Sequence, residues 1–287
     1  MRQFLKRTLL LSIVQTRSLF ALSLLALSLF TPAQAAERGK VEAFLEVTGF
    51  DVALDSIALS ASDAPRMLGL SAGDFGSEWT RLSRAVFNQE KMRELALDIL
   101  TETLEEEALS HAAAFYASDL GQRLVTAENA SHLVAEGDTK QAAGERIIAD
   151  LVKAGSKRVA LYHRMSRAID AAGSGLKSLQ QIQFRFLMAA NAAGVIELQL
   201  DAEGLRAFQR DQEAEMRIAL RASNLAASAY TYQGFSEAEV EAYVEALETP
   251  LMQQVYELLN AVQFEITANR FEALAYRMKE LGQGEDI

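Results

Sequence analysis

Proline is scarce in this chain, and its scarcity restricts the fold more than any other feature. Beyond residue 36 only Pro65 and Pro250 occur, while Ala, Leu, Glu, Gln and Arg dominate. These are residues that favour helix. Long alternating runs of β-branched and aromatic residues, which indicate strands, are absent from the sequence. Half of the 287 residues are hydrophobic, which is enough for a core. We therefore predict an all-α fold.

The chain contains no cysteine. This excludes a thiol nucleophile, a thiolate-ligated metal, a disulfide framework and the acylated cysteine of a bacterial lipoprotein. Stability must therefore come from packing.

Residues 1–36 have the pattern of an export signal peptide. An uncharged apolar run at 19–30 ends at Thr31-Pro32, before the small residues 33–36. Four cations precede this run: Arg2, Lys6, Arg7 and Arg17. The run is about a dozen residues long, whereas a membrane span needs roughly 20. We expect cleavage, a periplasmic or secreted location and no stable membrane span afterwards; retention of the segment as an anchor and a start codon further downstream are the alternatives.

Charge argues against nucleic acid as a partner. Without residues 1–36 the chain keeps 24 of its 28 basic residues against 39 acidic ones, a net charge of −15. Binding to a phosphate backbone needs a cationic surface, and an anionic membrane surface would repel this chain for the same reason.

Hydrophobic periodicity and helix-breaking residues divide the rest of the chain into helices. The expected helices lie near 38–48, 51–61, 75–87, 89–116, 119–131, 138–154, 156–172, 176–193, 201–232, 236–247 and 250–281. Ser236 and Glu239 form a capping box at one start. Thr249-Pro250 places a capping hydroxyl before a proline at the first helical position of another.

One helical pair recurs along the chain. A shift of 131 residues aligns 104–129 with 235–260 without a gap and superposes their apolar positions. Tandem duplication explains this pattern, and chance similarity between capped amphipathic helices is the alternative. We predict two related halves built of antiparallel helical hairpins: a first unit at 37–135 and a second at 175–287, joined by connecting helices at 136–174.

The corner of the first hairpin carries a family resemblance. Phe115-Tyr116-Ala117-Ser118-Asp119-Leu120-Gly121-Gln122-Arg123 resembles the signature of the bacterial exported family DUF2059, with Asp119 where the family usually has proline. A diverged second copy lies near Thr249-Pro250-Leu251-Met252-Gln253. The resemblance implies a small helical exported domain with no established activity. In this motif Phe115, Tyr116, Ser118, Gly121, Thr249 and Pro250 serve as structural cap and core residues.

Two histidines have a glutamate at a spacing found in metal sites. Glu107 and His111, and likewise Glu128 and His132, are four residues apart on a helix, which is a spacing that a metal site can use. Paired Glu-x-x-His motifs and the sequence His-Glu-x-x-His are absent. We therefore interpret these residues as solvated or helix-pairing, and expect no metal and no cofactor.

A basic stripe stands out in this acidic chain. Lys157, Arg164 and Arg167 fall within about 80° on one helix face, a possible contact for an anionic ligand or an acidic partner. Pairing with the glutamate-rich helices of the same chain is the favoured alternative. Trp79, Tyr116, Tyr162, Phe184 and Phe186 are expected in the core.

No motif in the sequence predicts catalysis, since phosphate loops and nucleophile elbows are absent. The leading prediction is a non-catalytic interaction or scaffold protein with an unidentified protein or envelope partner, and a homo-oligomer is compatible with it. A carrier for an apolar or anionic envelope ligand is the second hypothesis. A hydrolase that uses dispersed carboxylates is the third.

Overall fold

The computed structural model describes residues 36–61, 64–70, 76–134 and 137–281. All of the expected signal peptide except Ala36 lies outside these residues. The described helices belong to one compact unit of the chain, Ala35–Ile287. No strand occurs within the described ranges, so the all-α prediction is confirmed.

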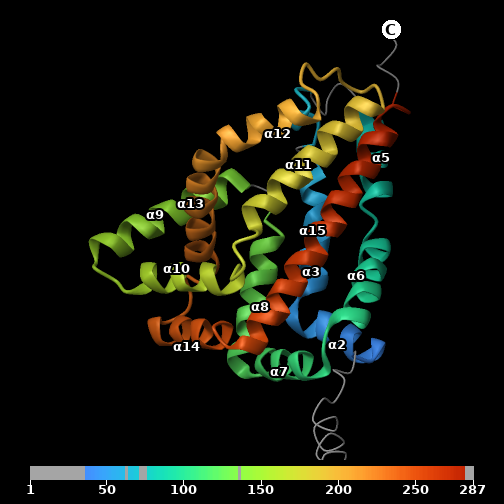
Figure 1. The fold of residues 1–287 in the computed structure, drawn as a ribbon. Coiled ribbons are helices and arrows are strands. Elements are labelled where there is room, and N and C mark those ends of the chain that lie inside the picture. Colours follow the sequence, from blue (N-terminus) through green and yellow to red (C-terminus); the bar gives the residue numbers. More distant parts are fainter. Residues whose placement is uncertain (1–35, 62–63, 71–75, 135–136, 282–287) are drawn as a thin grey trace, which may run out of the picture. The chain divides into compact units, whose positions relative to one another are not determined.

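The helices follow the expected order (Figure 1). Their bounds are α2 Arg38–Thr48, α3 Phe50–Ser60, α4 Ala64–Met67, α5 Gly76–Val86, α6 Gln89–Thr103, α7 Glu106–Tyr116, α8 Asp119–His132, α9 Gly137–Lys153, α10 Arg158–Ile169, α11 Gly175–Ala192, α12 Ala202–Asp211, α13 Glu213–Thr231, α14 Glu237–Leu247 and α15 Pro250–Met278.

Two expected helices are each divided in two, and α4 was not expected. The range 89–116 breaks at Leu104, which is fully buried and has extended backbone angles. Its carbonyl accepts a hydrogen bond from the amide of Ala36, 3.1 Å away. The range 201–232 breaks at Gln212, between α12 and α13. Neither break contains glycine or proline, so local sequence gave no signal for it.

The helix α15 is central to the packing. It lies against α11 along much of its length and also contacts α5, α6 and α7 (Figure 1). The ring of Phe271 on α15 makes edge contacts with Phe87, 5.5 Å away between centroids, and with Phe186 on α11, 5.2 Å away. Helices from both ends of the sequence therefore share one core.

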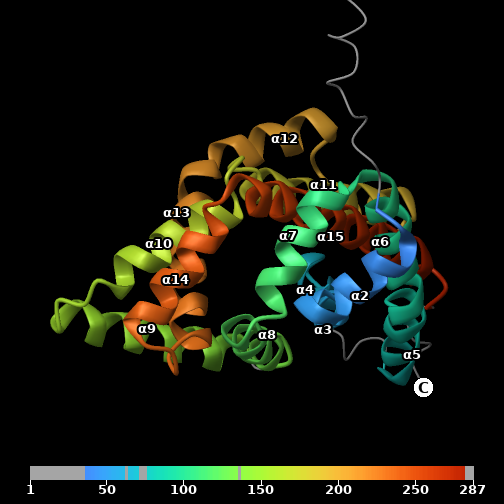
Figure 2. The ribbon, with the colours of Figure 1, turned by 90° about the horizontal axis from the view of Figure 1, so that it is seen from below.

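A second close pairing joins α9 and α13, which lie side by side at the edge of the described unit (Figure 2). A Cβ atom added to Gly144 on α9 would lie only 2.1 Å from the carbonyl oxygen of Ala226 on α13. Glycine at this position therefore allows the two backbones to approach each other, as small residues do in close helix packing.

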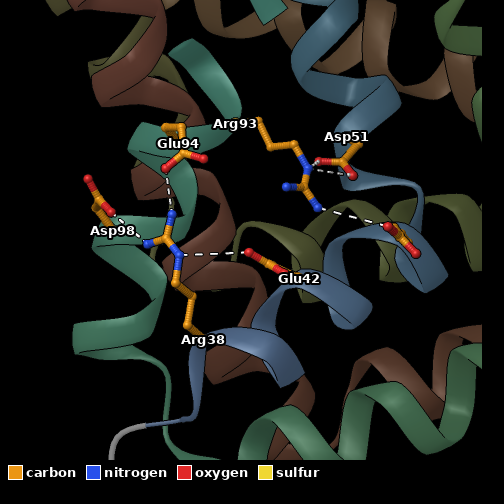
Figure 3. A network of polar contacts seen from close by, with 7 residues as sticks. Arg38, Glu42, Asp51, Arg93, Glu94 and Asp98 are labelled. Atoms are coloured by element: carbon orange, nitrogen blue, oxygen red, sulfur yellow. Dashed lines mark hydrogen bonds and ion pairs between the residues drawn. The ribbon is translucent and has the colours of Figure 1, made fainter. Parts of the chain in front are cut away.

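Ion pairs connect the first described helices on their exposed side. Arg38 on α2 binds Glu94 and Asp98 on α6 at 2.5 and 2.8 Å, and Arg93 on α6 binds Asp51 on α3 at 3.3 Å (Figure 3). Solvent-exposed pairs of this kind each contribute little free energy. They connect α2 and α3 to α6.

Two of the three predicted helix caps are present. Ser118 caps α8, since its hydroxyl accepts from the amide of Gly121 at 3.1 Å, and the capping box of Ser236 and Glu239 is present. Pro250 begins α15, but the predicted capping role of the Thr249 hydroxyl is wrong. That hydroxyl instead donates to the carbonyl of Ala246 at 2.8 Å and lies 3.0 Å from Nε2 of His111. The structure establishes helical hairpins, while the predicted relation between two halves remains a prediction.

Candidate functional site

A cavity of about 350 Å³ lies among nine helices of the described unit, namely α2, α3, α7, α8, α9, α10, α13, α14 and α15. It is partly open, and its lining combines apolar side chains with many polar ones. The polar lining residues include Tyr116, Glu128, Asn129, Ser131, His132, Lys140, Asp170, Asn224, Ser228, Tyr232, Tyr243, Tyr256, Asn260 and Gln263. This volume is at the lower end of the range of small-molecule sites, and a few convergent polar groups are typical of such sites.

One wall of the cavity is a cluster of four tyrosines around a glutamate. Oε1 of Glu128 on α8 accepts hydrogen bonds from the hydroxyls of Tyr232 at 2.7 Å and of Tyr243 at 2.9 Å. The Tyr243 hydroxyl also lies 3.2 Å from that of Tyr116 and 3.1 Å from that of Tyr256. The hydroxyls of Tyr116 and Tyr256 also bond to each other. We call these five residues the tyrosine–glutamate cluster.

Burial controls the electrostatics of this cluster. It raises the pKa of the Glu128 carboxyl above its ordinary value, although the two phenolic hydrogen bonds act in the opposite direction. It also raises the pKa of Tyr116, Tyr232 and Tyr243 well above the ordinary value. The phenols therefore stay protonated near neutral pH and act as donors to the carboxylate.

The number of protons limits the hydrogen bonds in the tyrosine–glutamate cluster. Five oxygen contacts connect its members, but when Glu128 is ionised the four phenols supply only four protons. Both contacts of Glu128 fall on Oε1. Its other oxygen, Oε2, accepts no hydrogen bond from any residue that the structure describes. The carboxylate thus retains an unused acceptor in a residue that lines the cavity.

Another part of the lining is basic. Nζ of Lys140 on α9 donates to the carbonyl of Ser131 at 3.0 Å, and burial lowers the pKa of Lys140. Desolvation, together with the Lys140 ammonium, lowers the pKa of His132 at the cavity rim. Asp170 is already engaged, because its carboxylate accepts from the backbone amides of Ser174 and Gly175 at 2.8 and 3.1 Å.

The hairpin corner between α7 and α8 positions Tyr116 and Glu128. A Cβ atom on Gly121 would lie 2.3 Å from the carbonyl oxygen of Phe115, so only glycine permits this approach of α8 to the end of α7. Gln122 donates to the carbonyl of Tyr116 at 2.6 Å, which holds the corner. The ring of Phe115 stacks on that of Tyr243, with centroids 5.8 Å apart. The signature residues thus build one side of the tyrosine–glutamate cluster.

The part of the chain that contains this corner matches a known family. Residues 90–150 match the model of a family described as "Uncharacterized protein conserved in bacteria (DUF2059)". The resemblance to DUF2059 is confirmed. No curated protein and no solved structure matches the chain.

The DUF2059 segment, residues 90–150, supplies much of the polar lining. Its members in the cavity are Tyr116, Glu128, Asn129, Ser131, His132 and Lys140. The other three tyrosines of the cluster come from α14, α15 and the end of α13. The carboxylate therefore belongs to the DUF2059 segment, and most of its phenolic donors belong to the chain that follows.

The predicted basic stripe lies elsewhere. Arg164 forms two hydrogen-bonded contacts with Glu248, at 3.0 and 2.6 Å. For Arg164, this is the pairing within the chain that was the favoured alternative. The side chains of Lys157 and Arg167 are exposed. None of the three lines the cavity. The structure therefore does not bring the stripe together with the candidate site.

The histidine pairs have different surroundings. His111 contacts Thr249, whereas Glu128 and His132 both line the cavity. The described residues contain no group of three or more His, Cys, Asp or Glu side chains arranged to hold a metal ion. Of the two expected environments, Glu128 has the pairing one, because its part-buried carboxylate bonds to Tyr232 at the end of α13 and to Tyr243 on α14.

Sequence reasoning missed the role of Glu128, Tyr232, Tyr243 and Tyr256. Four of the seven tyrosines in the chain meet in this cluster. Each has neighbours that form an ordinary apolar helix face, so a pattern along one helix does not distinguish it from a core residue. The remaining aromatic predictions are confirmed, since Trp79, Tyr162, Phe184 and Phe186 are buried. No helix within the described ranges is both long enough and apolar enough to cross a membrane.

Proposed function

We propose that this protein is a non-catalytic binding protein of the bacterial cell envelope that holds a small polar molecule in its central cavity. Of the functions expected from the sequence, this is closest to the carrier. The observation that supports it is a cavity lined by a carboxylate whose Oε2 atom has no partner among the described residues. The export signal expected at residues 1–36 supports the location.

The lining changes the expected type of ligand. A carrier for a purely apolar molecule would have a dry apolar cavity, but hydroxyl, amide and charged groups interrupt the mostly apolar wall of this one. An anionic ligand attracted by the basic stripe is not favoured either, because Lys157, Arg164 and Arg167 do not line the cavity. A small ligand that carries a polar group matches this lining better.

Native mass spectrometry of the protein isolated from its own cell envelope tests the proposal. We expect a small additional mass that is lost when the protein unfolds. Ala227→Phe, which fills the cavity from α13, should abolish this mass, whereas Ala222→Phe on the exposed side of the same helix should retain it. A folded Ala227→Phe protein that still carries the same mass would refute binding in this cavity.

A scaffold function is the second candidate, and one observation favours it. Large apolar side chains are exposed on α12, α13 and the segment before them, namely Leu200, Phe208 and Ile218, with exposed fractions of 45, 55 and 71%. Exposed apolar residues of this size are typical of protein contacts when they form one patch. A ligand-free mass together with a second copy or a second chain in the same experiment would support this function instead.

A further inference from the structure

We propose that the ligand carries a protonated primary amine and that Glu128 is its counter-ion. This inference rests on the proposed binding function and specifies the chemical class of the ligand. Its basis is the position of one unpaired carboxylate oxygen in a cavity, beside four tyrosine hydroxyls.

The two oxygens of Glu128 are used unequally. Oε1 accepts from both Tyr232 and Tyr243, so the carboxylate is held from one side. Oε2 receives no donor from the described residues. Glu128 is part-buried, and Oε2 is not among the fully buried atoms that lack a partner, so this oxygen is accessible. A donor supplied by a ligand could therefore bond to it directly.

No cation of the described chain neutralises this carboxylate. None of the ion pairs within the described residues includes Glu128. The cavity's own ammonium group, Lys140, is bonded to the carbonyl of Ser131. Removing a charge from water without a partner is costly, and the raised pKa of Glu128 reflects that cost. A ligand with a positive charge would complete the pair.

The tyrosine hydroxyls are compatible with the same charge. Tyr116, Tyr232, Tyr243 and Tyr256 line the cavity beside Glu128, and a phenolic oxygen can accept a hydrogen bond from a ligand cation. Because Oε2 and the side-chain oxygens of Asn260 and Gln263 are acceptors, a cation that has N–H donors matches the lining better than a quaternary ammonium does. A primary ammonium, with three donors, meets this requirement.

Binding of n-butylammonium to the full chain tests this inference, measured by protein NMR titration. We expect shift changes at Glu128 and the four tyrosines, and affinity at least tenfold higher than for 1-butanol, which has the same length but no charge. Glu128→Gln keeps an oxygen for the two phenols and should weaken n-butylammonium at least tenfold. Glu257→Gln, on the exposed side of α15, serves as the matched control and should bind as the unaltered protein does.

The affinity should also fall on acidification. Protonation of Glu128 removes the negative charge, so n-butylammonium should bind more weakly as the pH falls through the raised pKa of this group. The other titratable groups in the cavity are Tyr116, Tyr232, Tyr243, Tyr256, His132, Lys140 and Asp170. Because protonating His132 adds positive charge, it acts in the same direction. Glu128→Gln separates the two effects, since it removes only the contribution of Glu128.

Three results would overturn the assignment of the ligand: equal affinity for n-butylammonium and 1-butanol, tighter binding of butyrate, or undiminished binding to folded Glu128→Gln. The comparison of the three probes on the unaltered protein decides the question even where Glu128→Gln does not fold. If mass spectrometry finds a retained neutral or anionic molecule, the amine assignment fails while the binding function stands. If Ala227→Phe retains the same mass, the binding function itself fails.

Discussion

Gly121 shows how one residue fixes a corner of the fold. We expect Gly121→Ala to lower the free energy of unfolding by about 1–3 kcal/mol, because its methyl group would overlap the backbone of Phe115 and Tyr116. Gly39→Ala is the control, since Gly39 is exposed on α2 and an added methyl group there meets no atom within 4 Å. Chemical denaturation followed by circular dichroism measures both. Equal stability of the two variants would contradict the overlap.

The raised pKa of Glu128 predicts that the stability of the protein depends on pH. Its pKa is raised in the folded protein, so folding favours the protonated form, and this contribution to stability is lost as the pH rises through the folded-state pKa. Glutamine imitates the protonated form at every pH. The free energy of unfolding of Glu128→Gln, minus that of the unaltered protein, should therefore increase between pH 4 and pH 7, by about 1.4 kcal/mol for each unit of pKa difference. Urea denaturation at the two pH values measures this difference in the free energy of unfolding. A difference that does not change with pH would show that folding does not raise the pKa of Glu128.

At the scale of elements, the sequence predicted most helices because their apolar periodicity is local. Ser118 and the capping box of Ser236 are likewise local signals, and both are confirmed. The break at Leu104 was missed because it depends on a hydrogen bond to Ala36, 68 positions earlier in the chain. Thr249 was misassigned because its hydroxyl bonds to Ala246 and contacts His111, a residue far away in the sequence.

The pairing of α9 with α13 gives a test at this scale. In an isolated helix, Gly144→Ala would increase stability by about 1 kcal/mol. Here its methyl group would overlap the backbone of Ala226, so we expect a net loss of about 1–3 kcal/mol. Hydrogen exchange should accelerate in α13 more than in α15. A gain in stability would mean that the two helices separate at little cost.

At the scale of the whole molecule, the tyrosine–glutamate cluster could not be predicted, since its members come from α7, α8, α14, α15 and the end of α13. The predicted repeat located two hairpins in the sequence, but a repeat does not indicate how the hairpins pack against each other. Tyr116 was correctly expected in the core. Helical periodicity does not predict the direction of its hydroxyl group, which contacts Tyr243 and Tyr256 on other helices.

The start of the described fold supplies a further prediction. Ala36 is buried, and its amide donates to Leu104. A chain that begins at Ala35, in which the nitrogen of Ala36 remains a peptide amide, should therefore be more stable to unfolding than one that begins at Glu37, by about 1 kcal/mol, the usual contribution of one hydrogen bond. Thermal unfolding of the two chains, expressed separately, measures the difference. Equal midpoints would show that this contact contributes nothing.

The position of α15 has a consequence for how the molecule can be divided. This helix comes late in the sequence, yet its apolar side packs on α5, α6 and α7 as well as on α11. A break in the peptide chain at Gly173, between α10 and α11, would leave its partners on two separate polypeptides. Neither piece would bury its own apolar surface, but the two together would, so the protein is a natural candidate for reconstitution from complementary fragments.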